Sequence, residues 1–311
     1  MRHIFGPVPS RRLGRSLGID VIPAKTCSFD CIYCESGKTT HLTLKREQFV
    51  EPNEVLQELE EFFRVFPNGT DVLTFSSAGE PTLYLGIGEL IRAIRKSYPQ
   101  LPLIVLTNGS LLWDPEVRKD LLEAVRVVPS LDAVTPEVFR KINRPHPSLD
   151  VSKIVEGLRA FRAEYSGQLH LEIVLASGVN DSPEELSRLA EIAQTIEPDK
   201  IELNTVVRPP ALGGTEGLST ERMEWAATFF PEGRTEVVGV FNGQKRDSSG
   251  EDLETRILQT IERRPCTVPE LAASLGIAGS RLEEESQRLA RENKLIINSF
   301  NGKQFLCPIK S

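Results

Sequence analysis

The 311-residue chain has no long apolar segment, few cysteines and no excess of positive charge. No run approaches the roughly 18 consecutive apolar residues that suggest a membrane-spanning helix. The first residues show no apolar signal segment, so a location in the reducing cytoplasm is expected. The net charge of −7 argues against a protein that coats nucleic acids, although a local basic site remains compatible with it. Hydrophobic residues make up 40% and charged residues 26%, as in ordinary globular proteins.

Three of the five cysteines lie within eight residues, in Cys27-Ser28-Phe29-Asp30-Cys31-Ile32-Tyr33-Cys34. A 4Fe-4S cluster usually takes one thiolate for each iron, so three thiolates leave one iron without a protein ligand. An open position distinguishes a catalytic metal site from a closed structural one. A zinc site would need a further ligand such as His41, and a disulfide is disfavoured because three is an odd number. The spacing therefore favours a cluster with an open iron.

The rest of the chain alternates between strand-like and helix-like patterns. The strand-like apolar runs are 17–22, 71–75, 103–109, 126–132, 169–175 and 200–206. Helical periodicity fills the intervals between them, which predicts an α/β fold with a parallel sheet covered by helices. A doubly wound open sheet and a full or partial barrel both satisfy this pattern, and both place the site at the carboxyl ends of the strands.

The motif Cys27-x3-Cys31-x2-Cys34, with Tyr33 before the last cysteine, resembles the radical S-adenosylmethionine (radical SAM) enzymes. The resemblance implies a partial (β/α)6 barrel of the TIM type and a 4Fe-4S cluster whose open iron chelates the methionine moiety of SAM. It further implies that an electron from the cluster splits the sulfonium, and that the resulting 5′-deoxyadenosyl radical abstracts hydrogen from a substrate. A flavodoxin or ferredoxin type electron donor is then an expected partner.

The turn Ala78-Gly79-Glu80-Pro81 resembles the family's Gly-Gly-Glu-Pro motif, with Ala78 in place of the first glycine. The resemblance implies that this turn binds the amino group of SAM. A glycine lets the main chain approach a ligand closely, and a carboxylate matches an ammonium. By itself, however, Gly-Glu-Pro is a common turn.

Three further polar residues at or near strand ends are expected to contact the cofactor: Asn108, Ser130 and Asn204. The resemblance implies a ribose-binding hydroxyl or acid at the end of the fourth strand, and we assign Ser130 to the ribose and Asp132 to the substrate. Asn108 has the alternative interpretation of an Asn-Gly turn.

Candidate substrate-binding residues are mostly basic. They are Arg11, Arg15, Asp132, Arg144, His146 and Arg208. Residues 1–46 carry eight Lys or Arg against three acids, which leaves this part locally +5. One hypothesis is that the arginines near the N-terminus share an anionic substrate with Arg144 and His146. The alternatives are a solvated basic loop near the N-terminus and an ion pair at Arg208.

Several motifs together look like a bacterial and archaeal branch related to the tRNA wyosine-base synthases. They are Arg-Arg-Leu-Gly-Arg-Ser-Leu-Gly, the cysteine loop, Gly-Glu-Pro-Thr-Leu, Thr-Asn-Gly-Ser and Asn-Arg-Pro-His-Pro, within residues 5–245. The wyosine enzymes use additional N-terminal cysteines. This chain has no cysteine before Cys27, so the reaction of the wyosine enzymes is not predicted for it.

The C-terminal part, 247–311, is predicted to form a small second domain after the barrel of 1–246. The polar segment 247–250 indicates a linker, and helical patterns follow at 253–263, 268–274 and 280–292. The run 295–307 predicts a hairpin with an Asn-Gly turn. The set resembles a winged helix-turn-helix domain. DNA binding is disfavoured because the third helix begins with the acidic run Glu283-Glu284-Glu285, so contact with a protein, a peptide or the barrel is favoured.

The leading hypothesis is a radical SAM enzyme that modifies an RNA base, a peptide or an anionic metabolite. The alternative is a regulator that uses a cluster as a redox sensor and binds DNA. The polar strand ends favour the enzyme, because a sensor has no need of a SAM site. The substrate, the fate of SAM, the role of the C-terminal part and the oligomeric state are left open.

Overall fold

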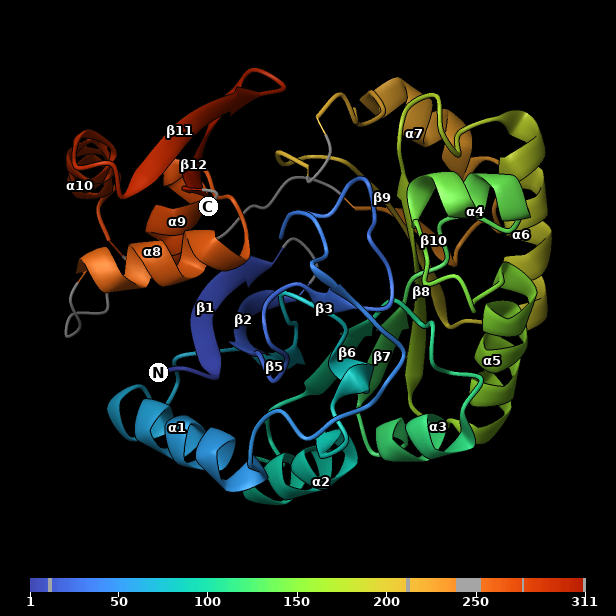
Figure 1. Ribbon diagram of the computed structural model, residues 1–311, viewed down its shortest axis with the longest axis horizontal. Helices are drawn as coiled ribbons and strands as arrows, with labels where there is room; N and C mark the ends of the chain where they lie inside the picture. Colours follow the sequence, from blue (N-terminus) through green and yellow to red (C-terminus); the bar gives the residue numbers. More distant parts are fainter. Residues whose placement is uncertain (11–12, 211–212, 239–252, 276, 310–311) are drawn as a thin grey trace.

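The computed structural model describes residues 1–10, 13–210, 213–238, 253–275 and 277–309. The predicted linker 247–250, the predicted domain boundary beside it and Arg11 lie outside these residues. A curved sheet with helices on its outer side forms the larger part of the molecule (Figure 1). No helix in the described ranges is long and apolar enough to cross a membrane.

The sheet has eight strands in the order β1-β2-β5-β6-β7-β8-β9-β10. The central six strands are β2 (Gly14–Ile19), β5 (Val72–Phe75), β6 (Leu103–Thr107), β7 (Arg126–Pro129), β8 (Gln168–Leu175) and β9 (Lys200–Thr205). Neighbours among these six pair in parallel. They correspond to the six runs predicted from the sequence. The first and last strands of the sheet are not paired with each other in the described chain, so the barrel is partial, as expected.

Two strands of the large sheet were not predicted. β1 (Ile4–Ser10) pairs antiparallel with β2, and β10 (Thr235–Val237) pairs parallel with β9. β1 contains Pro7 and Pro9, which argue against a central strand, and its place at the edge of the sheet is where proline is tolerated.

Helices follow the strands and shield the outer face of the sheet (Figure 1). They are α1 (Pro52–Val65), α2 (Ile87–Ser97), α3 (Pro115–Leu121), α4 (Pro136–Ile142), α5 (Val151–Glu164), α6 (Pro183–Ile196) and α7 (Thr220–Ala227), with a 3-10 turn, η1, at Pro81–Leu83. In α1, Val55, Leu59 and Phe62 are buried at helical spacing, so one face of this helix joins the core.

The two faces of each strand differ in character. In β2, Leu17 and Ile19 are fully buried in the outer core, while Ser16 and Gly18 alternate onto the inner face. The Ser16 and Thr74 hydroxyls lie 2.6 Å apart there. Because the inner face carries small and polar side chains, it leaves a cavity of about 350 Å³ inside the curved sheet, which we call the barrel cavity.

The C-terminal unit, residues 253–309, contains three helices and a hairpin. They are α8 (Leu253–Arg263), α9 (Val268–Leu275), α10 (Gly279–Arg291), β11 (Leu295–Phe300) and β12 (Lys303–Pro308). Asn301 and Gly302 have positive φ angles of 48° and 70°, which suit the tight turn between the two strands. The unit has its own apolar core, and in Figure 1 it lies beside β1. The predicted elements are therefore present; the winged-helix classification stays a prediction.

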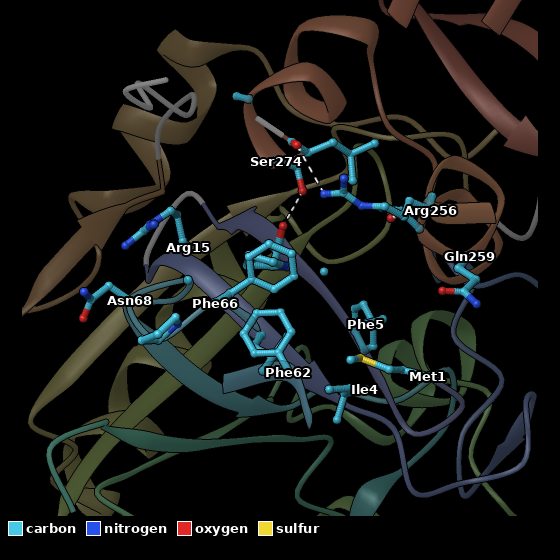
Figure 2. A pocket seen from close by; sticks show the side chains of 18 residues that line it. Met1, Ile4, Phe5, Arg15, Phe62, Phe66, Asn68, Arg256, Gln259 and Ser274 are labelled. Carbon is cyan, nitrogen blue, oxygen red and sulfur yellow. Dashed lines mark hydrogen bonds between the residues drawn. The ribbon is translucent and has the colours of Figure 1, made fainter. Parts of the chain in front are cut away.

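A second cavity of about 350 Å³ lies between the C-terminal unit and β1 (Figure 2). Phe62 and Phe66 enter it from α1 and the residues after it, and Gln259 enters from α8. The Ser274 hydroxyl donates a hydrogen bond to the Pro7 carbonyl at its edge. The described residues that line this cavity include none of the three clustered cysteines, so it is separate from the predicted site.

Candidate active site

The cysteine loop begins where the carboxyl end of β2 meets the turn after β5. The short strands β3 (Thr26–Cys27) and β4 (His41–Leu42) pair in parallel and enclose the loop. The Lys25 amide donates to the Ala78 carbonyl at 2.9 Å, and the Glu80 amide donates to the Thr26 carbonyl at 3.1 Å. The Gly-Glu-Pro turn therefore fixes the chain that enters the loop.

Position 79 must be glycine because the chain segment that enters the cysteine loop passes very close to it. A Cβ atom at this position would lie 2.0 Å from the Thr26 carbonyl oxygen, far inside contact distance. The close approach that the glycine permits is thus an approach of the protein's own backbone. Ala78 is buried and its carbonyl accepts from Lys25, so its methyl group is accommodated.

We expect Gly79→Ala to displace the cysteine loop. Because the obstacle is backbone, relaxation is limited, and the variant should lose roughly 1–3 kcal/mol of unfolding free energy together with much of its iron. Urea unfolding and iron analysis measure both. Gly279→Ala is the control, since open space surrounds that position; equal behaviour of the two variants would contradict the assignment.

The three thiols lie close together at the carboxyl end of the sheet. Burial raises the pKa of the Cys27 thiol to about 12, with Glu80 and Cys34 adding to the effect. Burial also raises the pKa of Cys31, to which Asp132, Cys27 and Cys34 contribute by charge repulsion. The Cys27 and Cys31 thiols are thus each affected by other thiols of the same loop.

Amide groups point at the sulfur atoms. The Phe29 amide and the Asn108 side chain each lie 3.5 Å from Cys27 Sγ, and Asn143 Nδ2 lies 3.5 Å from Cys31 Sγ. Backbone hydrogen bonds from Ser36 and Gly37 lower the pKa of Cys34, although burial raises it overall. N–H donors directed at sulfur stabilise thiolates, and such contacts tune the potential of iron-sulfur clusters.

This set of three soft thiols fits an iron-sulfur cluster. Among the described residues, no group of three His, Cys, Asp or Glu side chains is placed to hold a single metal ion. Cys266 and Cys307 are buried in the C-terminal unit, where Cys266 belongs to that unit's own core. The three soft thiols with their amide donors suit a cluster with three protein ligands.

Asp132 is a buried carboxylate that hydrogen-bonds to the cysteine loop. It follows β7, is only 2% exposed, and accepts hydrogen bonds of 2.6 Å from both the Tyr33 hydroxyl and Asn143 Nδ2. The Val174 amide donates to its other oxygen at 2.9 Å. Burial raises the pKa of Asp132 to about 6 despite these donors. The carboxylate is engaged with the cysteine loop, and the substrate contact expected of Asp132 stays a prediction.

The segment after α4 runs along the cysteine loop. The Asp30 amide donates to the Asn143 carbonyl at 3.1 Å, and the His146 amide donates to the Ser28 carbonyl at 2.9 Å. The guanidinium of Arg144 pairs with Asp30 at 2.7 Å. The motif Asn-Arg-Pro-His-Pro therefore holds the loop through contacts separate from those of the Gly-Glu-Pro turn.

Glu80 is a buried junction between two strand ends. It is 2% exposed and accepts from the Thr82 amide and hydroxyl, the Thr107 hydroxyl and the Asn108 amide, at distances of 2.6–3.0 Å. Burial raises its pKa. All four donors belong to the protein, so the expected contact with the SAM amino group stays a prediction. The same bonds orient Asn108, whose side chain reaches Ser28 at 2.8 Å.

Ser130 and Asn204 lie at the ends of their strands. The Ser130 amide donates to the Thr107 carbonyl at 3.0 Å, so Ser130 lies beside the end of β6. Asn204 lines the barrel cavity and donates to Glu172 Oε1 at 3.2 Å. Glu172 was not predicted from the sequence; its alternation with the buried Leu171 and Ile173 was the available signal.

The basic candidates do not gather at one place. Arg15 lies at the amino end of β2 and pairs with Asp71 at 2.8 Å, a strand's length from the cysteine loop and from Arg144 and His146. The expected convergence of these groups on one anion is therefore not seen among the described residues. Arg208 does line the barrel cavity, but its guanidinium forms ion pairs, which was the alternative interpretation.

Comparison with known proteins decides the family. Residues 21–190, more than half of the chain, match the Radical SAM superfamily. The chain belongs to the radical SAM superfamily. It is therefore an enzyme that uses an iron-sulfur cluster and SAM, as the sequence predicted. The branch related to the wyosine-base synthases stays a prediction.

Several relatives match nearly the whole chain. The UPF0026 protein of Methanocaldococcus jannaschii is 34% identical over 98% of this chain and 95% of its own. A protein of Brachyspira hyodysenteriae named GTPase Obg is 37% identical over 97% of this chain, which spans only 44% of that protein. Among solved structures, a radical SAM methyltransferase from Sphaerobacter thermophilus superposes with a TM-score of 0.56, at 16% identity, over 71% of this chain and 66% of its own. That likeness concerns the fold alone.

Proposed function

We propose that Cys27, Cys31 and Cys34 hold the 4Fe-4S cluster of this radical SAM enzyme and leave one iron for SAM. The observation that carries the proposal is the grouping of three thiols, each with N–H donors at its sulfur, at the carboxyl end of a parallel sheet. With both cofactors bound, a cluster held by these three cysteines would supply the electron for the reductive cleavage of SAM, the chemistry that prepares hydrogen abstraction from a substrate.

The remaining polar residues orient the ligands. Asn108 and Asn143 hold the sulfur atoms of Cys27 and Cys31, and the Gly-Glu-Pro turn fixes the entry of the loop. The Ser130 hydroxyl, for which no hydrogen bond is found with a described residue, is proposed for the SAM ribose, and Asn204 for a polar contact inside the barrel cavity.

We infer that the substrate enters the barrel cavity, because Cys34 forms part of its wall. Two acids, Glu35 and Glu172, and two arginines, Arg208 and Arg264, line the cavity together with several hydroxyl groups. Since these charges balance, the lining favours a neutral polar group, such as an RNA base or a peptide side chain, over an anionic metabolite. A low-potential reductant is required, and we propose a flavodoxin or ferredoxin type donor.

Anaerobic reconstitution with iron and sulfide, reduction, and chromatography for 5′-deoxyadenosine test this proposal. We expect SAM-dependent formation of 5′-deoxyadenosine and methionine, stimulated further by the substrate. The absence of SAM cleavage together with cluster-dependent binding of DNA would contradict the proposal and favour the redox-sensing regulator. Challenging the enzyme separately with RNA and with peptide fractions identifies the substrate class.

A further inference from the structure

A buried arginine connects the cysteine loop to the C-terminal unit. Arg208 follows β9 and is 4% exposed. Its Nη1 lies 3.1 Å from Glu35, the residue after Cys34, and its Nη2 lies 3.0 Å from Glu270 in α9. Three segments that are far apart in the sequence therefore meet at one guanidinium group.

The environment of Arg208 makes this connection stiff. A buried guanidinium is costly unless its charge is paired, and here two carboxylates share it. Burial would lower the pKa of Arg208, but Glu35 and Glu270 outweigh this effect and raise it. The planar fork of arginine can hold one carboxylate on each terminal nitrogen, whereas lysine presents a single point charge.

Glu270 is fixed on its other side as well. Its second oxygen accepts from the Thr267 amide at 3.0 Å, and the Glu270 amide donates to the Thr267 hydroxyl at 3.3 Å. This reciprocal pair is a capping box at the start of α9. Arg208 therefore pairs with a carboxylate that is itself fixed at the start of α9.

The C-terminal unit also contributes to the wall of the barrel cavity. Arg264, between α8 and α9, lines this cavity together with Cys34, Glu35 and Ser36. The C-terminal unit therefore affects the barrel cavity in two ways. Arg264 forms part of the cavity wall, and Glu270 forms an ion pair with Arg208, which also lines the cavity.

We propose that Arg208 is a positioning residue through which the docked C-terminal unit holds the last cysteine of the cysteine loop, Cys34, and the three residues after it in place. The loop segment concerned is 34–37, which contains the third cluster ligand and the two amides that face its sulfur. The C-terminal unit is then part of the active-site structure, and its undocking loosens the loop. The inference rests on the proposed function only in taking Cys34 as a cluster ligand.

Hydrogen exchange of the full-length chain, read by mass spectrometry, tests the connection in both directions. In Glu270→Gln, the single carbonyl oxygen of the new side chain can accept from Thr267 or from Arg208 but not from both. We expect exchange in segment 34–37 to rise roughly fivefold or more. Glu35→Gln should raise exchange at the start of α9 in the same way, because coupling between two sites is reciprocal.

Glu283→Gln is the matched control, since Glu283 is only half-buried on α10 and accepts a hydrogen bond from Gln287 of its own helix. It should leave segment 34–37 unchanged. The proposal would be overturned if Glu270→Gln and Glu35→Gln each changed hydrogen exchange only in the segment that carries the substitution. Arg208→Lys gives an independent check: it keeps the charge but should reproduce the faster exchange in both segments, and wild-type exchange there would also overturn it.

The reconstituted enzyme supplies a second measurement. The electron paramagnetic resonance line shape of the reduced cluster should change in Glu270→Gln and stay as in the wild type in Glu283→Gln. Because the exchange experiment needs no catalysis, a wild-type protein that fails to cleave SAM would contradict the proposed function while leaving the coupling through Arg208 testable.

Discussion

Replacing Cys31 with alanine is expected to abolish SAM cleavage and to leave the protein with little bound iron. Cys31 lies between the two other thiols in the sequence, and its sulfur accepts from Asn143. Loss of a residue that only supports a metal ligand typically costs about 10–100-fold in affinity or activity, so loss of the ligand itself should exceed that range. Iron and sulfide analysis and the rate of 5′-deoxyadenosine formation measure the effect.

The control is Cys266→Ala. Cys266 is a buried cysteine of the same chain, but it packs in the core of the C-terminal unit. This variant should keep the iron content and SAM cleavage of the wild type. A Cys31→Ala protein that retained a full complement of iron and normal cleavage would refute the ligand assignment.

Replacing Glu80 with alanine is expected to cause the second largest effect. The carboxylate satisfies four donors at a site that is almost completely buried. Removing it leaves the donors of Thr82, Thr107 and Asn108 without their acceptor, and a buried unsatisfied polar group typically costs about 1–3 kcal/mol. The unfolding free energy of the apoprotein should fall by at least about 3 kcal/mol.

The same substitution should loosen the contact between Asn108 and Cys27, so the iron content should fall as well. Urea unfolding of the apoprotein separates the effect on stability from the effect on the cluster. Glu60→Ala, on the exposed side of α1, is the control. A loss of stability below about 1 kcal/mol, the centre of the distribution for ordinary substitutions, would contradict the role of Glu80 as a junction.

The central fold could be predicted from the sequence because each parallel strand is a short apolar run between helical stretches. The six strands β2 and β5–β9 and the partial barrel were confirmed. β1 was missed because Pro7 and Pro9 resemble loop signals, and its strand state depends on an edge position beside β2 that local sequence cannot reveal.

The cysteine motif identified the family, but the support of the loop could not be predicted. Tyr33, Asp132 and Asn143 are brought together by hydrogen bonds between residues that are 11–99 positions apart, and no local pattern encodes them. Charge alone was a poor guide to the basic residues, because Arg15, Arg144 and Arg208 each have an acidic partner contributed by a distant segment.

The most direct test of the three-ligand cluster is Mössbauer spectroscopy of the protein reconstituted with ⁵⁷Fe, recorded without and with SAM. Cys27, Cys31 and Cys34 together can ligate only three of the four irons. We therefore predict that SAM shifts the signal of one iron in four and leaves the other three nearly unchanged. Four irons that do not respond to SAM, or a cluster of another type, would contradict the account.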